Sequence, residues 1–193
     1  MAFILETIVV TTSPHGVPHV APYGLIAADD GYVVAPFRPS PAIENLLATP
    51  YAVASCPRDV RVIAGCVTGR RDWPTEPAEA VPGLRLADAY SHLELAVTAI
   101  EDHPERPRFH CRIEHERLVA PFRGYNRAQG AVVEAAILST RLGMLARDKV
   151  EAELAYLAIA VEKTAGPAER EAWEWILARV RDHLARADGG AAR

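Results

Sequence analysis

The chain has 193 residues, of which 50% are hydrophobic and 24% charged, a balance that excludes fibrous and wholly disordered proteins. Its formal net charge of -4 gives no overall electrostatic reason to bind nucleic acid or an anionic membrane surface. The apolar stretches are too short to span a membrane, and the start shows no signal-peptide pattern. The 3 cysteines contain no CxxC pair, so we expect no disulfide framework, no zinc knuckle and a cytoplasmic location.

Strands separated by turns are predicted over most of the chain before residue 122, because β-branched and aromatic residues cluster there between Pro, Gly and Asp groups. The predicted strands cover residues 6–12, 17–27, 32–35, 51–55, 60–68, 91–101 and 108–118, with a Pro-rich loop over 72–83. No long helix is predicted between neighbouring strands. The sheet is therefore expected to be antiparallel and to close on itself, in an α+β fold.

Helices are predicted at two places. A short one begins at Pro41, with Ser40 as its cap, and ends at about Ala48. After Asn126 the apolar residues recur at helical spacing in three stripes: Val133, Ile137, Thr140 and Met144; then Val150, Leu154, Leu157 and Val161, capped by Asp148; then Trp173, Ile176, Leu177, Val180 and Leu184. We expect a barrel over 1–122, a helical extension over 123–188 that packs on the barrel or a second subunit, and a frayed tail over 189–193.

The segment around Arg38 and Ser40 is the first candidate binding site. It brings a guanidinium, a hydroxyl and the N–H groups of a helix start to one place, where a phosphate would fit. The structural alternative is that Ser40 only caps the helix and Arg38 is a solvated charge. From spacing alone both interpretations stay open.

A second candidate site precedes the first long helix. Arg123 and Arg127 could both face an anion, and Asn126 could cap the helix. The alternative is a junction whose arginines pair with acids such as Glu134.

Other chemistry is disfavoured by the sequence. Strand alternation predicts that Cys111 and His115 share one face while His110 lies on the other, so we expect no metal site. There is no GxSxG nucleophile motif, no GxGxxG and no P-loop.

Several segments together resemble an archaeal and bacterial family of unknown function, domain of unknown function 447. They are residues 6–12 (ETIVVTT), 16–24 (GVPHVAPYG), 36–40 (PFRPS) with 44–46 (ENL), 122–128 (FRGYNRA), 133–137 (VEAAI), 140–142 (TRL) and 161–167 (VEKTAGP). The resemblance implies the FMN-binding split β-barrel shared with flavin reductases, and a homodimer with FMN near the subunit interface.

The resemblance also implies which residues contact the flavin. Arg38 and Ser40 would meet its phosphate, with Asn45 assisting from the following helix. The strands carrying Thr11 and Thr12 would border the isoalloxazine ring together with His19, Ala21, Pro22 and Tyr23, largely through backbone groups. Arg123 and Asn126 complete the expected cofactor-binding set.

The resemblance implies a cofactor rather than a reaction. The leading hypothesis is a flavoprotein that passes electrons between FMN and a small partner, such as NAD(P)H. The competing hypothesis is a non-catalytic FMN carrier or sensor. A third, based on association alone, is a redox step in tetrahydromethanopterin one-carbon metabolism.

Overall fold

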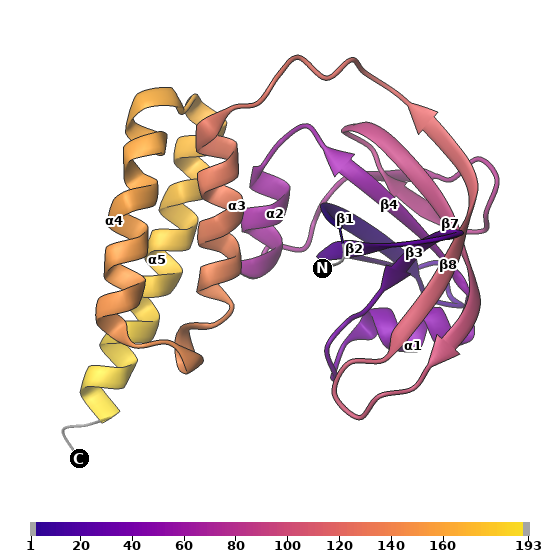
Figure 1. Ribbon diagram of the computed structural model, residues 1–193, viewed down its shortest axis with the longest axis horizontal. Coiled ribbons are helices and arrows are strands. Elements are labelled where there is room, and N and C mark those ends of the chain that lie inside the picture. Colours follow the sequence, from indigo (N-terminus) through magenta and orange to yellow (C-terminus); the bar gives the residue numbers. More distant parts are fainter. Residues whose placement is uncertain (1–2, 191–193) are drawn as a thin grey trace. The chain divides into compact units, whose positions relative to one another are not determined.

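The computed structural model describes residues 3–190, and its chain forms two compact units (Figure 1). The barrel unit comprises the residues up to Arg58 together with Asp72–Phe122, and the helical unit comprises Asp59–Arg71 together with the residues from Arg123 onward.

The barrel unit is built on a closed antiparallel barrel with the strand order β1-β2-β3-β8-β7-β4. The strands are β1 (Ile4–Thr12), β2 (Pro18–Ala28), β3 (Gly31–Val34), β4 (Tyr51–Pro57), β7 (Ala89–Glu101) and β8 (Arg108–Leu118). Pairing of β1 with both β2 and β4 closes the barrel. The sequence predicts an α+β fold, in which a closed antiparallel barrel precedes a helical extension. The structure confirms this fold class.

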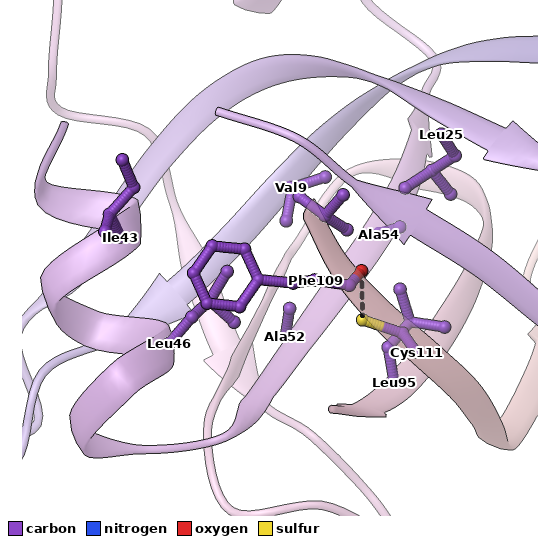
Figure 2. Packing of buried hydrophobic residues seen from close by; sticks show 10 residues of the cluster. Val9, Leu25, Ile43, Leu46, Ala52, Ala54, Leu95, Phe109 and Cys111 are labelled. Carbon is purple, nitrogen blue, oxygen red and sulfur yellow. Dashed lines mark hydrogen bonds between the residues drawn. The ribbon is translucent and has the colours of Figure 1, made fainter. Parts of the chain in front are cut away.

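The core of this unit lies inside the barrel, around Phe109, which is fully buried (Figure 2). Figure 2 shows Ile43 and Leu46 of α1 (Pro41–Ala48) beside the Phe109 ring, so α1 supplies part of the core. Because alternate side chains along a strand face the same side, Thr11, two residues after the core position Val9, faces the same interior. This placement brings polar side chains of β1 toward α1.

A small two-stranded sheet lies where the sequence predicts only a loop. It pairs β5 (Thr75–Pro77) with β6 (Leu84–Leu86), and β6 contacts β1 and β4. The Pro-rich composition hid these short strands, since Pro is tolerated at an edge where no ladder N–H is needed.

The strand predicted over residues 60–68 is wrong: the structure has a helix there, α2 (Arg61–Val67). Asp59 starts it by accepting a hydrogen bond from the Arg61 N–H at 2.8 Å, and the Thr68 hydroxyl donates to the carbonyl of Ala64 at its end. Five consecutive residues of α2 are buried, from Val62 to Cys66. A helix buried all round carries a continuous apolar run, which is also the pattern of a buried strand.

The helical unit also contains α3 (Arg127–Ser139), a short 3-10 turn η1 (Leu142–Met144), α4 (Arg147–Thr164) and α5 (Pro167–Gly190). The first predicted stripe is partly wrong, because α3 ends before Thr140 and Met144 is 85% exposed. The buried side of α3 is instead rich in alanine, which lets neighbouring helices approach closely.

The predicted cap of α4 is also wrong. Ala146 is the N-cap, and Asp148 lies inside the first turn, where its carboxylate accepts a hydrogen bond from the Lys149 N–H. An acidic residue in a first turn still favours the helix through the macrodipole.

The last helix, α5, continues through Gly190. Residues 191–193 of the expected frayed tail lie outside the described residues. Within residues 3–190, no helix is both long and apolar enough to cross a membrane.

Candidate functional site

The beginning of α1 follows directly from its local sequence. Ser40 has an extended backbone, and its Oγ accepts a hydrogen bond from the Ala42 N–H at 3.3 Å. Pro41 occupies the first helical position, where its missing N–H costs nothing. The predicted Ser40 cap is therefore confirmed.

Ser40 has a second partner, which comes from the barrel. The phenolic oxygen of Tyr23 on β2 lies 2.9 Å from its Oγ, and the Tyr23 carbonyl accepts a hydrogen bond from the Thr7 hydroxyl of β1. The start of α1 is thus tied to β2, and β2 to β1, through polar groups that are only partly buried.

Another polar contact lies deeper. The Asn45 side-chain amide of α1 donates to the hydroxyl of Thr11 at 3.0 Å, and both residues are less than a tenth exposed. Because buried polar groups need hydrogen-bond partners, this bond stabilises the Asn45 amide beside the apolar core. The Tyr23–Ser40 pair and this Thr11–Asn45 pair place four of the predicted residues at one end of the barrel. We call this set, with Arg38, the α1 cluster.

Arg38 lies just before α1, with 41% of its side chain exposed. Its Nη2 pairs with Asp102 at 3.0 Å, and its Nε donates to the carbonyl of His103 at 3.3 Å. A second guanidinium, that of Arg106, stacks on Phe37 with 4.7 Å to the ring centroid. Exposed pairs of this kind are weak, so an anion could compete with Asp102 for Arg38.

The backbone N–H groups at the start of α1 already have partners. Pro41 has none to give, Ala42 donates to the Ser40 hydroxyl, and Ile43 donates to the Ser40 carbonyl at 3.0 Å. A bound anion at this end would therefore depend chiefly on Arg38 and the hydroxyls, supported by the helix dipole.

The remaining barrel residues of the predicted site lie on the β1–β2 ladder. Thr12 pairs with Pro18, Thr11 with His19, Val9 with Ala21 and Ile8 with Pro22. Thr11 also pairs with Ala52 of β4, so its backbone lies between two strands. Contacts from Thr11 to a ligand would consequently use its side chain.

Arg123 and Asn126 belong to the helical unit. Asn126 caps α3: its Oδ1 accepts from the N–H groups of Ala128 and Gln129, and its Nδ2 donates to the carbonyl of Thr164 at 3.1 Å. The capping interpretation of Asn126 is confirmed. Arg123 is exposed in the segment before the helix.

The predicted alternation along β8 is interrupted by an irregularity. The register slips between the Glu94–His115 and Leu95–Ile113 pairs, so Cys111 faces the core whereas His115 lies 3.4 Å from Glu79 outside it. A bulge adds one residue to a strand and reverses the alternation beyond it. The expectation that Cys111 and His115 share a face is thus wrong. Among residues 3–187, whose side chains the structure describes, no three His, Cys, Asp or Glu side chains form a metal-binding group.

One polar network was missed by sequence reasoning. Ser55 and His92, both at most 1% exposed, are joined at 3.0 Å through Nδ1, and the His92 Nε2 lies 3.1 Å from Nη1 of Arg85. A guanidinium can only donate, so Nε2 accepts and the proton lies on Nδ1, directed at Ser55. His92 therefore cannot take the Ser55 proton, and this pair is not a catalytic nucleophile and base.

Burial, together with the nearby positive charge of Arg85, lowers the pKa of His92 to about 4. Next to it on β7, the carboxylate of Glu94 accepts hydrogen bonds from three consecutive backbone N–H groups, those of residues 79–81. The network thus holds the segment around β5 and β6 in place. Alternation along β7 indicates that these two polar residues share a face, but not that the face is covered.

The fold defines a class of protein: a closed antiparallel barrel joined in one chain to a helical unit. The model for "Protein of unknown function (DUF447) N-terminal domain" matches residues 5–120, and that for "Protein of unknown function (DUF447)" matches 126–178. The chain belongs to this family. None of the curated proteins matches it.

Solved structures share the fold. An FMN-bound protein of the same family from Methanosarcina mazei is 18% identical, with a TM-score of 0.77 over 91% of this chain and 94% of that one. The 2-nitrobenzoate 2-nitroreductase of Pseudomonas fluorescens is 18% identical, with a TM-score of 0.51 over 59% of this chain and 64% of its own. An FMN-binding protein from Thermus thermophilus, with bound p-hydroxybenzaldehyde, is 14% identical, with a TM-score of 0.51 over 64% and 77% of the two chains.

Proposed function

We propose that this protein binds FMN and acts as a small-molecule oxidoreductase. The observation that carries the proposal is the likeness in fold, along 91% of this chain, to an FMN-bound protein of its own family. The shorter likeness to a nitroreductase supports the redox part of the proposal.

The α1 cluster is the proposed place of the flavin phosphate. Arg38 offers a guanidinium that is 41% exposed and held only by Asp102 and a carbonyl, so it can turn to a phosphate. The hydroxyls of Ser40 and Tyr23 can rotate to donate to the same group. Asn45 positions the Thr11 side chain beneath them. An arginine, two hydroxyls and the positive end of a helix fit a phosphate monoester.

The β1–β2 ladder is the proposed border of the isoalloxazine ring. Thr12, His19, Ala21 and Pro22 would contribute there, since the ladder brings them next to Thr11 and Tyr23. Arg123 remains a proposed cofactor-binding residue. A contact from Asn126 would cost the cap of α3, because both ends of its amide are in use.

FMN, when bound, supplies the electron and hydride transfer, so the chain need only bind, orient and shield it. We propose NAD(P)H or a similar small molecule as the electron donor, and a homodimer as the active form. A non-catalytic FMN carrier or sensor is the second candidate, because the hydroxyls, amide and guanidinium gathered in the α1 cluster can bind a flavin phosphate whether or not the flavin is turned over. A role in pterin-linked one-carbon metabolism would be one case of the first candidate.

The visible absorption spectrum tests the proposal. The purified protein is mixed with FMN and passed through a desalting column, and we expect flavin bands at a fixed ratio to protein. A colourless protein would overturn the proposal. Steady-state oxidation of NAD(P)H by the loaded protein then separates the two candidates: turnover supports the oxidoreductase, and its absence supports the carrier.

A further inference from the structure

The helical unit contains a cavity of about 520 Å³, which lies between the ends of α2 and α3, the η1 turn and the part of α5 from Trp175 to Arg186. This volume falls in the range of about 300–1,000 Å³ typical of small-molecule sites. All of its lining residues belong to the helical unit. None of them is part of the α1 cluster.

The lining is strongly basic. It includes Arg70, Arg179 and Arg186, together with His183, against a single carboxylate, that of Asp182. Within residues 3–190 none of the three guanidiniums forms an ion pair, although Asp182 stands only three or four residues from two of them on α5. In a protein whose formal net charge is -4, this excess of positive charge is local.

Two of the arginines are held in fixed positions. The Arg70 Nη1 donates to the Thr68 hydroxyl at 2.8 Å, and its guanidinium stacks on Trp175 with 3.7 Å to the ring centroid. Thr68 is itself held by its hydrogen bond to the Ala64 carbonyl. Arg179 donates through Nε to the Ser139 carbonyl at 3.2 Å, and neither of its terminal nitrogens has a hydrogen-bond partner among the described residues. Donors that are positioned in advance lose less entropy when a ligand binds.

The hydroxyls of the cavity cannot provide further donors. Ser139 and Thr140 both direct their protons to carbonyls of α3, as Thr68 does to α2. Their oxygens therefore face the cavity as acceptors, and the guanidiniums are its principal donors. A ligand that satisfies this arrangement brings acceptor oxygens with more than one negative charge, which a phosphate does and a single carboxylate does not.

We propose that this cavity binds a phosphate-bearing small molecule, at a site separate from the proposed flavin site. Arg70 and Arg179 bind the phosphate oxygens, and Arg186 adds positive charge to the cavity lining. Because the cavity is larger than inorganic phosphate, the remainder of the ligand is a polar body that can donate to the oxygens of Ser139 and Thr140. The structural alternative is that Arg70 and Arg179 merely complement the C-terminal ends of α2 and α3. Arg186 distinguishes the two interpretations, since it forms no hydrogen bond or ion pair with the residues that the structure describes.

The test uses the full-length protein saturated with FMN, so that the flavin site is not the reporter. Trp175 is labelled by incorporation of 5-fluorotryptophan, and its fluorine resonance is followed as four probes are added: inorganic phosphate, adenosine 5′-monophosphate, adenosine and acetate. Trp73→Phe and Trp173→Phe variants assign the signal. We expect saturable shifts with the two phosphate compounds and none with adenosine or acetate at the same ionic strength.

Variants locate the binding. Loss of one charge-assisted hydrogen bond in Arg70→Ala or Arg179→Ala should weaken adenosine 5′-monophosphate by about 10- to 100-fold. Arg186→Ala should weaken it several-fold without affecting folding, whereas Arg181→Ala, on the same helix but outside the cavity, should not. All four variants should keep their flavin bands, which separates failure here from failure of the proposed function.

Three binding results would overturn the proposal. They are a wild-type resonance that no phosphate compound shifts, binding that survives in the Arg70→Ala/Arg179→Ala double variant, or a saturable response to acetate equal to that of phosphate. Loss of flavin from the Arg70→Ala and Arg179→Ala variants would instead mean that the cavity holds the FMN phosphate, which also overturns a separate site.

Discussion

The phenolic oxygen of Tyr23, on β2, lies 2.9 Å from the hydroxyl oxygen of Ser40, the residue that caps α1. This hydrogen bond joins two residues that are 17 positions apart, and it couples the orientation of the helix to the wall of the barrel.

Removing this bond should cost a small, measurable part of the folding free energy. We expect Tyr23→Phe to destabilise the protein by about 1 kcal/mol, and Ser40→Ala by about 1–2 kcal/mol because it also removes the cap. In urea denaturation the double variant should cost less than the sum of the two, which measures the coupling. Tyr51→Phe is the matched control, because the Tyr51 phenol forms no hydrogen bond within the part of the chain that the structure describes. Strict additivity would show that the two hydroxyls do not interact.

Arg38→Ala should weaken FMN binding by about 1.5–3 kcal/mol, the value of a charge-assisted hydrogen bond, while leaving the fold intact. Equilibrium titration of flavin fluorescence measures the effect. Arg58→Ala is the control, because Arg58 forms a comparable exposed pair with Asp88 at 3.2 Å in the same unit. Equal flavin affinity in the two variants would remove Arg38 from the site.

His92 should make the stability depend on pH. Its pKa is about 4 in the folded protein, against 6.5 when unperturbed, so between these values the unfolded chain binds a proton that the folded chain does not. The contribution of His92 to the free energy of unfolding is therefore fully present above about pH 6.5, and roughly 3 kcal/mol of it is lost as the pH drops to about 4. In His92→Gln the slope over this window should flatten, whereas His15→Gln, in an exposed turn, should leave it unchanged. An unaltered slope in His92→Gln would contradict the assignment.

Glu94→Ala should be among the most destabilising single changes in the barrel unit. It leaves three backbone N–H groups without their acceptor, at a cost of about 3 kcal/mol or more. Thermal unfolding followed by circular dichroism measures the loss. Glu116→Ala, an exposed carboxylate on β8, should change the midpoint little. If the two variants unfold alike, the segment around β5 and β6 does not depend on Glu94.

Only Cys56 should react rapidly with a thiol reagent in the native protein. Cys66 and Cys111 are buried, and burial raises the pKa of the Cys111 thiol to about 12. Burial also raises the pKa of Cys56, so its labelling should accelerate as the pH increases. Cys56→Ser should abolish the fast phase, and all thiols should react once the protein is unfolded. A fast phase that persists in Cys56→Ser would mean that another cysteine is accessible.

Features governed by neighbouring residues could be predicted from the sequence. The cap at Ser40 and the end of α1 at Ala48 follow from local chemistry, and β8 has the predicted bounds. The helix α2 was mistaken for a strand because burial on every side removes the periodicity that distinguishes the two.

For the candidate site, the sequence predicts which residue types take part but not which of them contact one another. The Thr11–Asn45 and Tyr23–Ser40 hydrogen bonds depend on how β1, β2 and α1 meet, which no local pattern encodes. The burial of His92 and Glu94 likewise depends on a distant segment that covers them. Such polar groups look like an ordinary solvated strand face until the covering segment is known.

The placement of α2 has a consequence for how the protein is made. This helix is encoded between β4 and β5, yet it packs on α3 and α5, which are encoded after the last strand of the barrel. On the ribosome, its apolar residues emerge first and have no helical neighbours until the end of the chain has been synthesised. The barrel strands can pair in the meantime, but the helical unit can only be completed last. A chain shortened after Phe122 would carry α2 as an uncovered apolar helix, so the later helices cannot be discarded as an optional appendage.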